Sequence, residues 1–468
     1  MKAEIISSEV VRVTGTPSAG TVTRALEPYS RGNLCWHVPP QFVPAGLVPN
    51  ALLRLAQRDP KPWDLAVRVP DLLWQSLYAY QQEGVKRIVH QFGGRCLLAD
   101  EMGLGKTRQA LCAILHYNVT TLVICPSFMQ TTWRRVLAQY TTNSTVCSYG
   151  KIVCGTYGMV IVDEAHYLKS LESQRTQAVL PLLLLAKRVI LMTGTPCPNR
   201  PEELFPLLHA LRPQLAPSVD AYTARYCNPR STPWNPRDTR GSDREDELKW
   251  LLQRAYWIRR TKQCVLKDLP SKHTSTLYVD SAAASRPTLA RLKERLQSAM
   301  RSGSKLAQNL ISEMYRATCE AKQEAAVELV AAGTRGAGAV VIFAHHKAML
   351  DAAEAVLPHD GTVGRIDGTT SLSRRQVVVD GIQDGSLQIA ILSMGAAGVG
   401  LTLTRACTAY FLEIPWCPAV LRQCEDRIHR IGQTRLTQIY YIIANDTLDT
   451  YVWRAIHRKE QVGARIGQ

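Results

Sequence analysis

The sequence predicts an α/β fold with two parallel β-sheets and helical insertions between them. Short apolar runs at residues 96–99 and 122–125 end in turns and alternate with helical stretches, which is typical of parallel strands buried on both faces. This alternation stops near residue 196 and resumes at residues 339–343. A chain of 468 residues is also long enough for two or three domains, each with its own core.

The first part of the chain divides into a leader and a first lobe. Residues 1–70 contain scattered prolines and no sustained hydrophobic period, so we expect an irregular leader that lies along the first lobe. Residues 71–196 are expected to form that lobe, with further buried strands at 160–162 and 189–192.

The remainder divides into three segments. Residues 197–325 are expected to form helical, basic insertions and the segment between the lobes, because seven basic and two acidic residues lie between Ser281 and Arg316. Residues 326–447 are expected to form the second lobe, and residues 448–468 a helical tail. Two patterns support these assignments, namely helical spacing at Leu289, Leu292, Leu296 and Met300 and apolar strands at 339–343, 388–392 and 409–412.

Composition narrows the possible partners. The formal net charge of +17, from 56 Lys and Arg against 39 Asp and Glu, predicts attraction to a polyanion such as nucleic acid, with simple solubility as the alternative.

The 13 cysteines include no C-x2-C pair, so we expect no zinc. No run of about 20 apolar residues is present to span a bilayer, and the first residues lack the form of a secretion signal.

A phosphate-binding loop is predicted directly after the strand at 96–99. Four residues there carry the chemistry: Gly103, Gly105, Lys106 and Thr107. The glycines allow a tight turn whose N–H groups face a β-phosphate, the lysine neutralises charge and the threonine holds magnesium. The strict pattern has glycine where this chain has Asp100. An ordinary glycine-rich turn is the alternative.

Two further polar groups follow the next buried strands. Asp163 and Glu164 come directly after residues 160–162, and adjacent carboxylates at the end of a strand suit a Mg²⁺–water ligand and a base that orients the attacking water. The alternative for this pair alone is a solvated helix start. Thr193 and Thr195 follow the strand at 189–192, where their hydroxyls would couple the ATP state to lobe position, with a plain turn as the alternative.

Two arginines in the second lobe are candidate catalytic residues. Arg427 and Arg430 lie within residues 423–433, where we expect a helix, so that both side chains project from one face. Guanidinium groups stabilise the charge that develops on a transferring phosphoryl group. A surface helix with two salt bridges is the alternative.

The order and spacing of these motifs over residues 70–460 resemble a Swi/Snf-type superfamily-two ATPase. The resemblance implies two RecA-like lobes, a nucleotide-binding and ATP-binding hydrolase of the helicase type that depends on DNA, and ATP with Mg²⁺ as cofactors. It is carried by residues 80–85, 100–107, 259–262, 269–272, 365–371 and 395–401. It implies that Gln81 selects adenine and that ATP is coupled to DNA by Thr193, Thr195, Gly398, Gly400 and Gln423.

Within this family, the chain is similar to the HARP-type annealing helicases that remodel stalled replication forks. Residues 73–85, 186–191 and 343–347 carry that likeness. It implies DNA binding and DNA repair at forks, double-stranded or forked DNA as partner, and a place in the nucleus, although the sequence shows no clear import signal. A helix that recruits single-strand DNA binding protein is not evident in the sequence. We expect a monomer and no membrane association.

One segment departs from the family pattern. Residues 152–154 and 159–162 both read as strands, yet only four residues separate them. Parallel neighbours need a crossover of about a dozen residues or more, and the relatives place a helix and a DNA-contacting loop there. Either one of the two strands is misassigned, or this lobe has lost that element and tracks DNA less well.

The sequence therefore favours an ATP-dependent double-stranded DNA translocase that anneals or remodels branched DNA. A chromatin-remodelling ATPase, an RNA helicase and a DNA-binding scaffold with little ATP turnover are the alternatives. ATPase rates without nucleic acid and with duplex, forked DNA and RNA discriminate between them. The direction of translocation and the preferred DNA structure do not follow from the residues.

Overall fold

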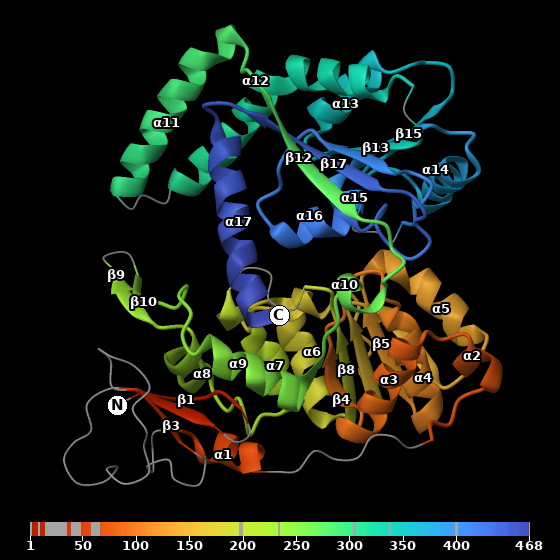
Figure 1. The fold of residues 1–468 in the computed structure, drawn as a ribbon, viewed down its shortest axis with the longest axis vertical. Helices are drawn as coiled ribbons and strands as arrows, with labels where there is room; N and C mark the ends of the chain where they lie inside the picture. The colour runs from red at the N-terminus through yellow and green to blue at the C-terminus, as the bar shows by residue number, and fades with distance from the viewer. Residues whose placement is uncertain are drawn as a thin grey trace. The chain divides into compact units, whose positions relative to one another are not determined.

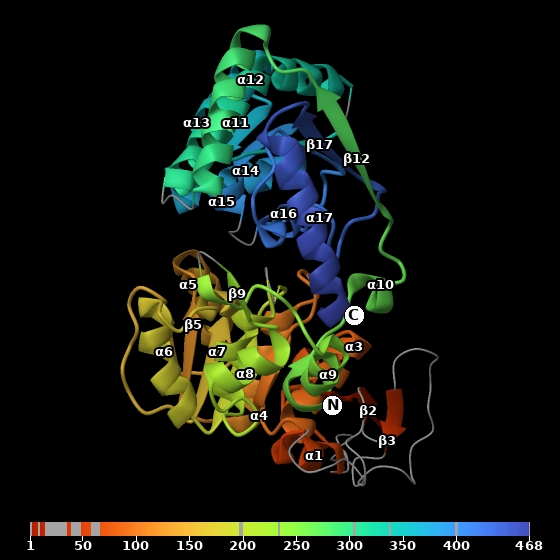
Figure 2. The same ribbon diagram turned by 90° about the vertical axis from the view of Figure 1, so that its left-hand side faces the viewer.

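The computed structural model describes residues 2–7, 10–14, 35–38, 48–57, 66–195, 200–232, 235–302, 306–336, 338–397 and 401–467. The chain forms two compact units (Figures 1 and 2). The first comprises Met1–Glu101, Gly105–Thr261 and Val462–Gln468, and the second comprises Met102–Leu104 and Lys262–Gln461.

The described part of the first unit is built on a sheet of six parallel strands in the order β11-β4-β8-β7-β5-β6. Its strands are β4 (Arg95–Leu98), β5 (Thr121–Cys125), β6 (Ser144–Ser148), β7 (Met159–Asp163), β8 (Arg188–Met192) and β11 (Trp257–Ile258). The strands expected from the apolar runs at 96–99, 122–125, 160–162 and 189–192 are therefore confirmed. Their side chains alternate between two cores, one on each face of the sheet.

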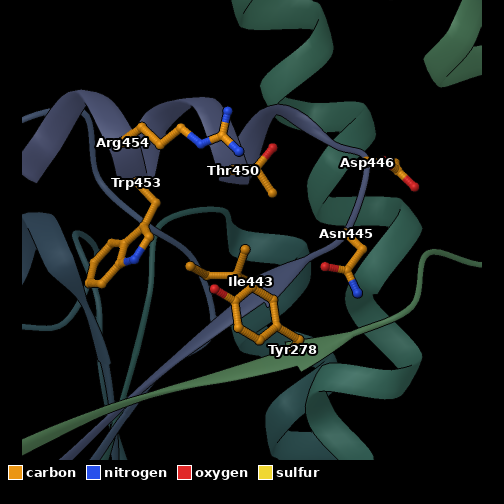
Figure 3. Close-up of a pocket in the computed structure, with 7 residues that line it drawn as sticks. All are labelled: Tyr278, Ile443, Asn445, Asp446, Thr450, Trp453 and Arg454. Atoms are coloured by element: carbon orange, nitrogen blue, oxygen red, sulfur yellow. The ribbon is translucent and has the colours of Figure 1, made fainter.

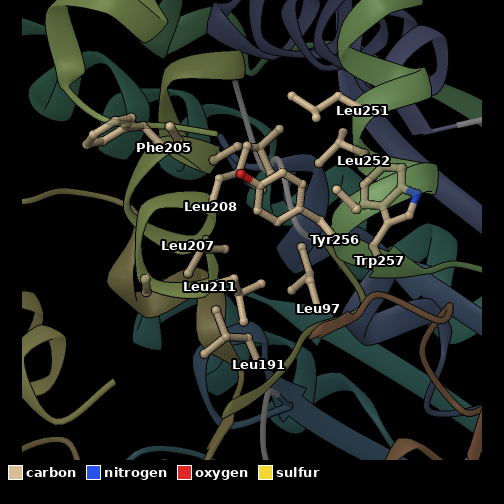
Figure 4. Packing of buried hydrophobic residues seen from close by; sticks show 14 of the residues in the cluster. Leu97, Leu191, Phe205, Leu207, Leu208, Leu211, Leu251, Leu252, Tyr256 and Trp257 are labelled. Atoms are coloured by element: carbon tan, nitrogen blue, oxygen red, sulfur yellow. The ribbon is translucent and has the colours of Figure 1, made fainter. Parts of the chain in front are cut away.

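Helices cover both faces of this sheet (Figure 1). The helices of the first unit are α1 (Asn50–Gln57), α2 (Asp71–Gln75), α3 (Ala79–Lys86), α4 (Lys106–Tyr117), α5 (Gln130–Ala138), α6 (Gln174–Leu185), α7 (Phe205–Leu211), α8 (Val219–Tyr226) and α9 (Glu245–Leu251). Apolar residues of α3, α4 and α5 fill one core, whereas those of α6, α7 and α9 fill the other. Figure 4 shows the second core, where leucines of α7 pack beside Tyr256 and Leu97.

The N-terminal residues that the structure describes are not irregular, which corrects the expectation for residues 1–70. Strands β1 (Lys2–Ile5), β2 (Val11–Thr14) and β3 (Cys35–Val38) form an antiparallel sheet. Scattered prolines between short strands concealed it. Ile5 is buried in the first unit's core, and its N–H donates to Glu247 Oε2 of α9 over 2.9 Å.

The region after β8 contains more than helical insertions. Strands β9 (Arg230–Thr232) and β10 (Asn235–Asp238) pair with each other, and β11 joins the main sheet beside β4. The two-residue strand β11 is too short to register as an apolar run. Through it, residues predicted to lie outside the first lobe complete that lobe's sheet.

The crossover from β6 to β7 resolves the segment that departs from the family pattern. The strand predicted at 152–154 is wrong: β6 is Ser144–Ser148, and the following ten residues, 149–158, cross to β7 without a helix. We call residues 149–158 the strap. β6 and β7 lie on opposite sides of β5, and Tyr149, Ile152 and Tyr157 of the strap pack against the core on one face of the sheet.

The described part of the second unit also contains six parallel strands, in the order β12-β17-β16-β13-β15-β14. They are β12 (Lys272–Val279), β13 (Val340–Ala344), β14 (Val363–Ile366), β15 (Ile389–Ser393), β16 (Thr408–Phe411) and β17 (Thr437–Ala444). Its helices are α10 (Lys262–Val265), α11 (Arg286–Arg301), α12 (Leu306–Thr334), α13 (Lys347–Val356), α14 (Leu372–Asp384), α15 (Met394–Ala397), α16 (Pro418–Glu425) and α17 (Leu448–Gly467). The predicted α/β fold with two parallel sheets is confirmed.

Two details of the basic region differ from the prediction. β12 was missed because its side chains are mostly exposed and polar, yet it pairs with β17 along eight residues. In α11 the leucines Leu289, Leu292 and Leu296 are buried as expected, whereas Met300 is 55% exposed and Ala299 takes the buried position. None of the helices in the described part of the chain is long and apolar enough to cross a membrane.

Candidate functional site

The predicted motifs of the first lobe meet at one edge of its sheet. The phosphate loop follows β4, the acidic pair ends β7, and Thr193 follows β8, which lies between β4 and β7. The carboxyl ends of parallel strands share one edge, and ligands bind at that edge in open α/β sheets. The fold therefore places the first-lobe motifs together, while Gly398 and Gly400 lie outside the described residues.

The phosphate loop has the backbone expected of a phosphate cradle. Gly103 and Gly105 adopt positive φ angles of 84° and 75°, and α4 begins directly at Lys106. Lys106 Nζ donates to the carbonyl oxygens of Asp100 over 2.8 Å and Glu101 over 3.4 Å. The ammonium group is thus held along the loop, and Thr107 occupies the first turn of α4.

Gln81 packs against this loop. A Cβ atom added at Gly105 would lie 2.3 Å from Gln81 Nε2, so the amide occupies the space that glycine leaves open. Gln81 is buried, and its Oε1 accepts the N–H of Tyr78 over 3.0 Å at the start of α3. The residue expected to select adenine therefore lies beside the predicted phosphate site.

Asp100, which replaces the glycine of the strict pattern, has a defined structural role. Its buried carboxylate accepts from Arg260 Nε over 2.9 Å and Nη2 over 2.6 Å, and from Gln109 Nε2 over 2.9 Å. Arg260 also donates to the carbonyl oxygen of Tyr80 and lies 5.2 Å from the centre of that ring. One guanidinium group thereby joins the phosphate loop, α4 and the segment of Gln81.

The carboxylate of Asp163 is held by two neutral donors. Trp133 Nε1 donates to Asp163 Oδ2 over 2.9 Å, and the N–H of Glu164 donates to Asp163 Oδ1 over 3.0 Å. Burial, and then the neighbouring charge of Glu164, raises the pKa of Asp163 to about 6. Glu164 has a left-handed φ of 54°, which turns the chain sharply at the end of β7. A buried carboxylate with this environment is suited to receive a cation.

A polar chain links the acidic pair to the threonines after β8. His166 Nδ1 lies 3.3 Å from Glu164 Oε2 and 3.1 Å from Thr193 Oγ1, which accepts the N–H of Thr195 over 3.1 Å. The structure thus brings Thr193 and Thr195 into contact with the pair, through a histidine whose part the sequence prediction missed. Pro196 of the same motif lies outside the described residues.

In the second unit, α16 ends at Glu425, so the helix expected over residues 423–433 is wrong beyond that point. In a helix that continued to residue 433, the carbonyl oxygens of residues 427–429 would accept from residues 431–433. They have other donors instead: Arg427 O accepts from Leu403 N, Ile428 O from Gln433 Nε2, and His429 O from Lys262 Nζ. The chain continues in turns that place Arg427 and Arg430. Gln423 stays within α16.

The two arginines influence each other although they do not share a helical face. Arg427 is buried, and burial followed by the charge of Arg427 lowers the pKa of Arg430. Carboxylates next to them in sequence have cationic partners, since Asp426 pairs with Lys262 and Glu425 with Lys272. The surface-helix alternative with two salt bridges therefore does not describe this segment.

One group in the described part of the chain has the residue types of a metal site. Cys319, His346 and Glu413 offer atoms within 4.8 Å of one another. Glu413 already accepts the N–H groups of His345 and His346 over 2.7 and 2.9 Å, and His346 Nδ1 lies 2.5 Å from its other oxygen. We interpret this group as a clamp between the ends of β13 and β16.

A pocket of about 330 Å³ lies elsewhere in the second unit, at the ends of β12 and β17 (Figure 3). Its lining residues are Tyr278, Ile443, Asn445, Asp446, Thr450, Trp453 and Arg454. None of these residues belongs to the predicted motifs. We therefore place the candidate site at the motifs and not at this pocket.

Family models match residues in both units. Residues 80–152 and 149–324 match the family described as SNF2-related domain, and residues 321–432 match the helicase conserved C-terminal domain. Among solved structures, the Sulfolobus solfataricus SWI2/SNF2 ATPase core in complex with dsDNA matches with a TM-score of 0.42 and 20% identity, covering 86% of this chain and 96% of that chain.

Curated relatives cover most of the chain. A SWI/SNF-related matrix-associated actin-dependent regulator of chromatin subfamily A-like protein 1 from Xenopus tropicalis is 35% identical over 437 residues, covering 86% of this chain and 46% of the relative. The DNA annealing helicase and endonuclease ZRANB3 from Homo sapiens is 35% identical over 439 residues, covering 84% and 40%. The chain thus spans less than half the length of these two relatives.

Proposed function

Because the chain belongs to the SNF2-related family, we propose that it is an ATP-dependent double-stranded DNA translocase that anneals or remodels branched DNA. The observation that carries the proposal is the meeting of the phosphate loop, the acidic pair and the threonines at one sheet edge. The relatives named as annealing helicases favour branched DNA as the substrate.

Each first-lobe residue has a role in this proposal. Gly103, Gly105 and Lys106 bind the phosphates of ATP, and Gln81 selects adenine beside them. Thr107 and Asp163 hold Mg²⁺, the latter through water, and Glu164 orients the attacking water. When bound, Mg²⁺ neutralises charge on the phosphates. The residues fit this ion, because Asp163 is a buried carboxylate whose hydrogen bonds come from neutral donors.

The second-lobe residues supply positive charge and coupling. Arg427 and Arg430 stabilise the phosphoryl group during transfer, which is the role of arginine fingers in phosphoryl-transfer enzymes. Support comes from the burial of Arg427 and from the lowered pKa of Arg430. A nearby anion would stabilise the positive charge of such buried groups. Thr193, Thr195, Gly398, Gly400 and Gln423 couple the ATP state to DNA.

DNA is bound chiefly through phosphates in this proposal. The net charge of +17 supports binding that depends strongly on salt and little on base sequence. We further propose that the protein acts in the nucleus, in DNA repair at replication forks, as a monomer that meets single-strand DNA binding protein on the DNA. Light scattering of the purified protein and co-sedimentation with that binding protein test the last two points.

The deciding experiment compares ATPase stimulation by forked DNA, plain duplex, single strands and RNA at one fixed salt concentration. We expect the greatest stimulation by forked DNA, together with ATP-dependent rewinding of a bubble held open by single-strand binding protein. Equal stimulation by all DNA forms removes the preference for junctions. Stimulation by RNA alone overturns the DNA assignment.

A nucleosome-sliding assay tests the second candidate, a chromatin-remodelling ATPase. That candidate is favoured by the name of the Xenopus tropicalis relative, a regulator of chromatin. Sliding without rewinding would select it. DNA binding without ATP turnover would instead select the scaffold alternative.

A further inference from the structure

The carboxylate of Asp163 is fixed at both oxygens. Oδ1 accepts the N–H of Glu164 over 3.0 Å, and Oδ2 accepts Trp133 Nε1 over 2.9 Å. Each carboxylate oxygen can accept two hydrogen bonds, so each keeps a position for a further ligand. Rotation of this side chain would break one of the two bonds, and the orientation of the remaining positions is therefore set by the donors.

Trp133 is a rigid source of one of these bonds. It lies on α5, is fully buried, and its ring belongs to the core between that helix and the sheet. Leaving its N–H without an acceptor in this core would cost about 1–3 kcal/mol. This cost opposes any movement that separates the indole from the carboxylate of Asp163, so the hydrogen bond fixes the orientation of the carboxylate. The bond connects residues 30 positions apart.

We infer that Trp133 is a positioning residue for the divalent cation that accompanies the nucleotide, acting through the carboxylate of Asp163. The inference rests on the proposed function, in which Asp163 holds Mg²⁺ through water. Groups that orient a metal ligand through a hydrogen bond set metal affinity, and their loss costs about 10- to 100-fold. Because Asp163 contacts the ion through water, we expect the loss of Trp133 to lie at the lower end of this range. Trp133 itself does not touch the nucleotide or the ion in this role.

Trp133→Phe is the variant that tests this role, because it keeps an aromatic ring in the core and removes the donor. We expect the affinity for ADP with Mg²⁺, measured by titration calorimetry, to fall by about 10-fold, while the affinity for ADP in EDTA stays unchanged. Binding of Mn²⁺ in the presence of ADP, followed by electron paramagnetic resonance, should weaken by the same factor. Neither measurement depends on turnover.

Two controls separate positioning from packing. Trp250→Phe removes a buried indole of α9 in the same unit, in the opposite core, and should leave the Mg²⁺ dependence of ADP binding unchanged. In an Asp163→Asn background, Trp133→Phe should cause no further loss of Mg²⁺ dependence, because the two residues act as one unit. A merely structural tryptophan would lower the melting temperature equally in both backgrounds.

The outcomes distinguish this inference from the proposed function. If the unaltered chain binds ADP more tightly with Mg²⁺ and Trp133→Phe preserves that gain, the positioning role is overturned and the nucleotide site stands. If the unaltered chain gains nothing from Mg²⁺ or Mn²⁺, the assignment of Asp163 fails and the positioning role falls with it. A melting temperature above the assay temperature establishes that Trp133→Phe is folded.

Discussion

Two buried carboxylates, Glu413 of the second unit and Asp163 of the first, have opposite electrostatic environments. In the second unit, Glu413 contacts His346, Glu425 pairs with Lys272, and Asp449 pairs with Lys322. Hydrogen bonds and the His346 charge keep the pKa of Glu413 below its usual range despite burial. In the first unit, the carboxylate of Asp163 accepts hydrogen bonds from the N–H groups of Trp133 and Glu164, and burial followed by the charge of Glu164 raises its pKa to about 6.

The difference shows which buried charges stabilise the fold and which are poised for a ligand. A carboxylate with a cation beside it is already compensated and acts as a structural tie. Asp163 instead bears a desolvation cost that an incoming cation would relieve. The second unit has the converse case in Arg430, whose pKa is lowered by burial and by Arg427.

The largest effect is expected from Arg430→Ala. Loss of an arginine finger reduces turnover by about 10³-fold or more, because it stabilises the transition state more than the ground state. ATP turnover with forked DNA should therefore fall steeply, while ATP binding persists. Arg374→Ala, an exposed arginine of α14, is the matched control and should retain turnover. Full activity of Arg430→Ala would assign that residue to the fold alone.

Lys106→Ala should remove most ATP turnover, by about 10²- to 10³-fold, because a preorganised positive charge at the phosphates is lost. DNA affinity should stay nearly intact, since other basic residues provide it. ATPase rates and DNA binding at one salt concentration measure the two properties separately. Turnover above about half the normal rate would contradict the phosphate-loop assignment.

The pH dependence of stability should have opposite signs at Asp163 and Glu413. The pKa of Asp163 is raised from 3.8 to about 6 in the fold, so its protonated form contributes stability below about pH 4 that is lost as the pH rises to about 6. The pKa of Glu413 is lowered from 4.5, so its contribution is present above that value and is lost as the pH falls.

Denaturant unfolding of Asp163→Asn and Glu413→Gln from about pH 3 to about pH 7 measures both signs. Relative to Asp163→Asn, the unaltered chain should lose roughly 1–3 kcal/mol between about pH 4 and 6. Relative to Glu413→Gln, it should gain stability as the pH rises toward neutral, because the hydrogen bonds from His345 and His346 favour the charged carboxylate. Parallel curves for both variants would show that the two carboxylates do not differ in environment.

The smallest effect is expected from Tyr149→Phe. The hydroxyl of Tyr149 donates to the carbonyl oxygens of Asp163 over 2.6 Å and Glu164 over 3.1 Å, and its loss should cost about 1 kcal/mol of stability. A few-fold loss of turnover should accompany it, because the acidic pair is less firmly held. Tyr157→Phe, whose hydroxyl contacts Val153 within the strap, is the control. Equal turnover in both variants would exclude a role for Tyr149 at the pair.

The fold and the motif positions could be predicted where the sequence signal is local. Apolar runs gave the central strands, and the loop at Gly103–Lys106 follows from its glycines and lysine. β12 could not be found this way, because an edge strand with exposed polar side chains lacks the apolar pattern. The end of α16 also escaped prediction, since it depends on distant donors such as Lys262 and Leu403.

The supporting residues of the site were missed for the same reason. Trp133 and Asp163 are 30 positions apart, and Arg260 reaches Asp100 across 160 positions. No spacing rule connects such residues, since the sheet order brings them together. Asp100 was the one signal in the sequence for such a contact. A carboxylate at a position where the strict pattern has glycine predicts a cationic partner, because a buried charge is costly unless it is paired.

The strap also sets which changes of length this lobe tolerates. Ten extended residues reach about 33 Å. From the end of β6 to the start of β7, the chain must run back along the length of a five-residue strand and across two inter-strand spacings, a distance of about 20 Å. Removing more than about three or four residues would therefore pull β6 out of register, whereas doubling the length costs only about 0.6 kcal/mol in closure entropy. Residues 153–156 are exposed, so an inserted domain or reporter is best accommodated at that point.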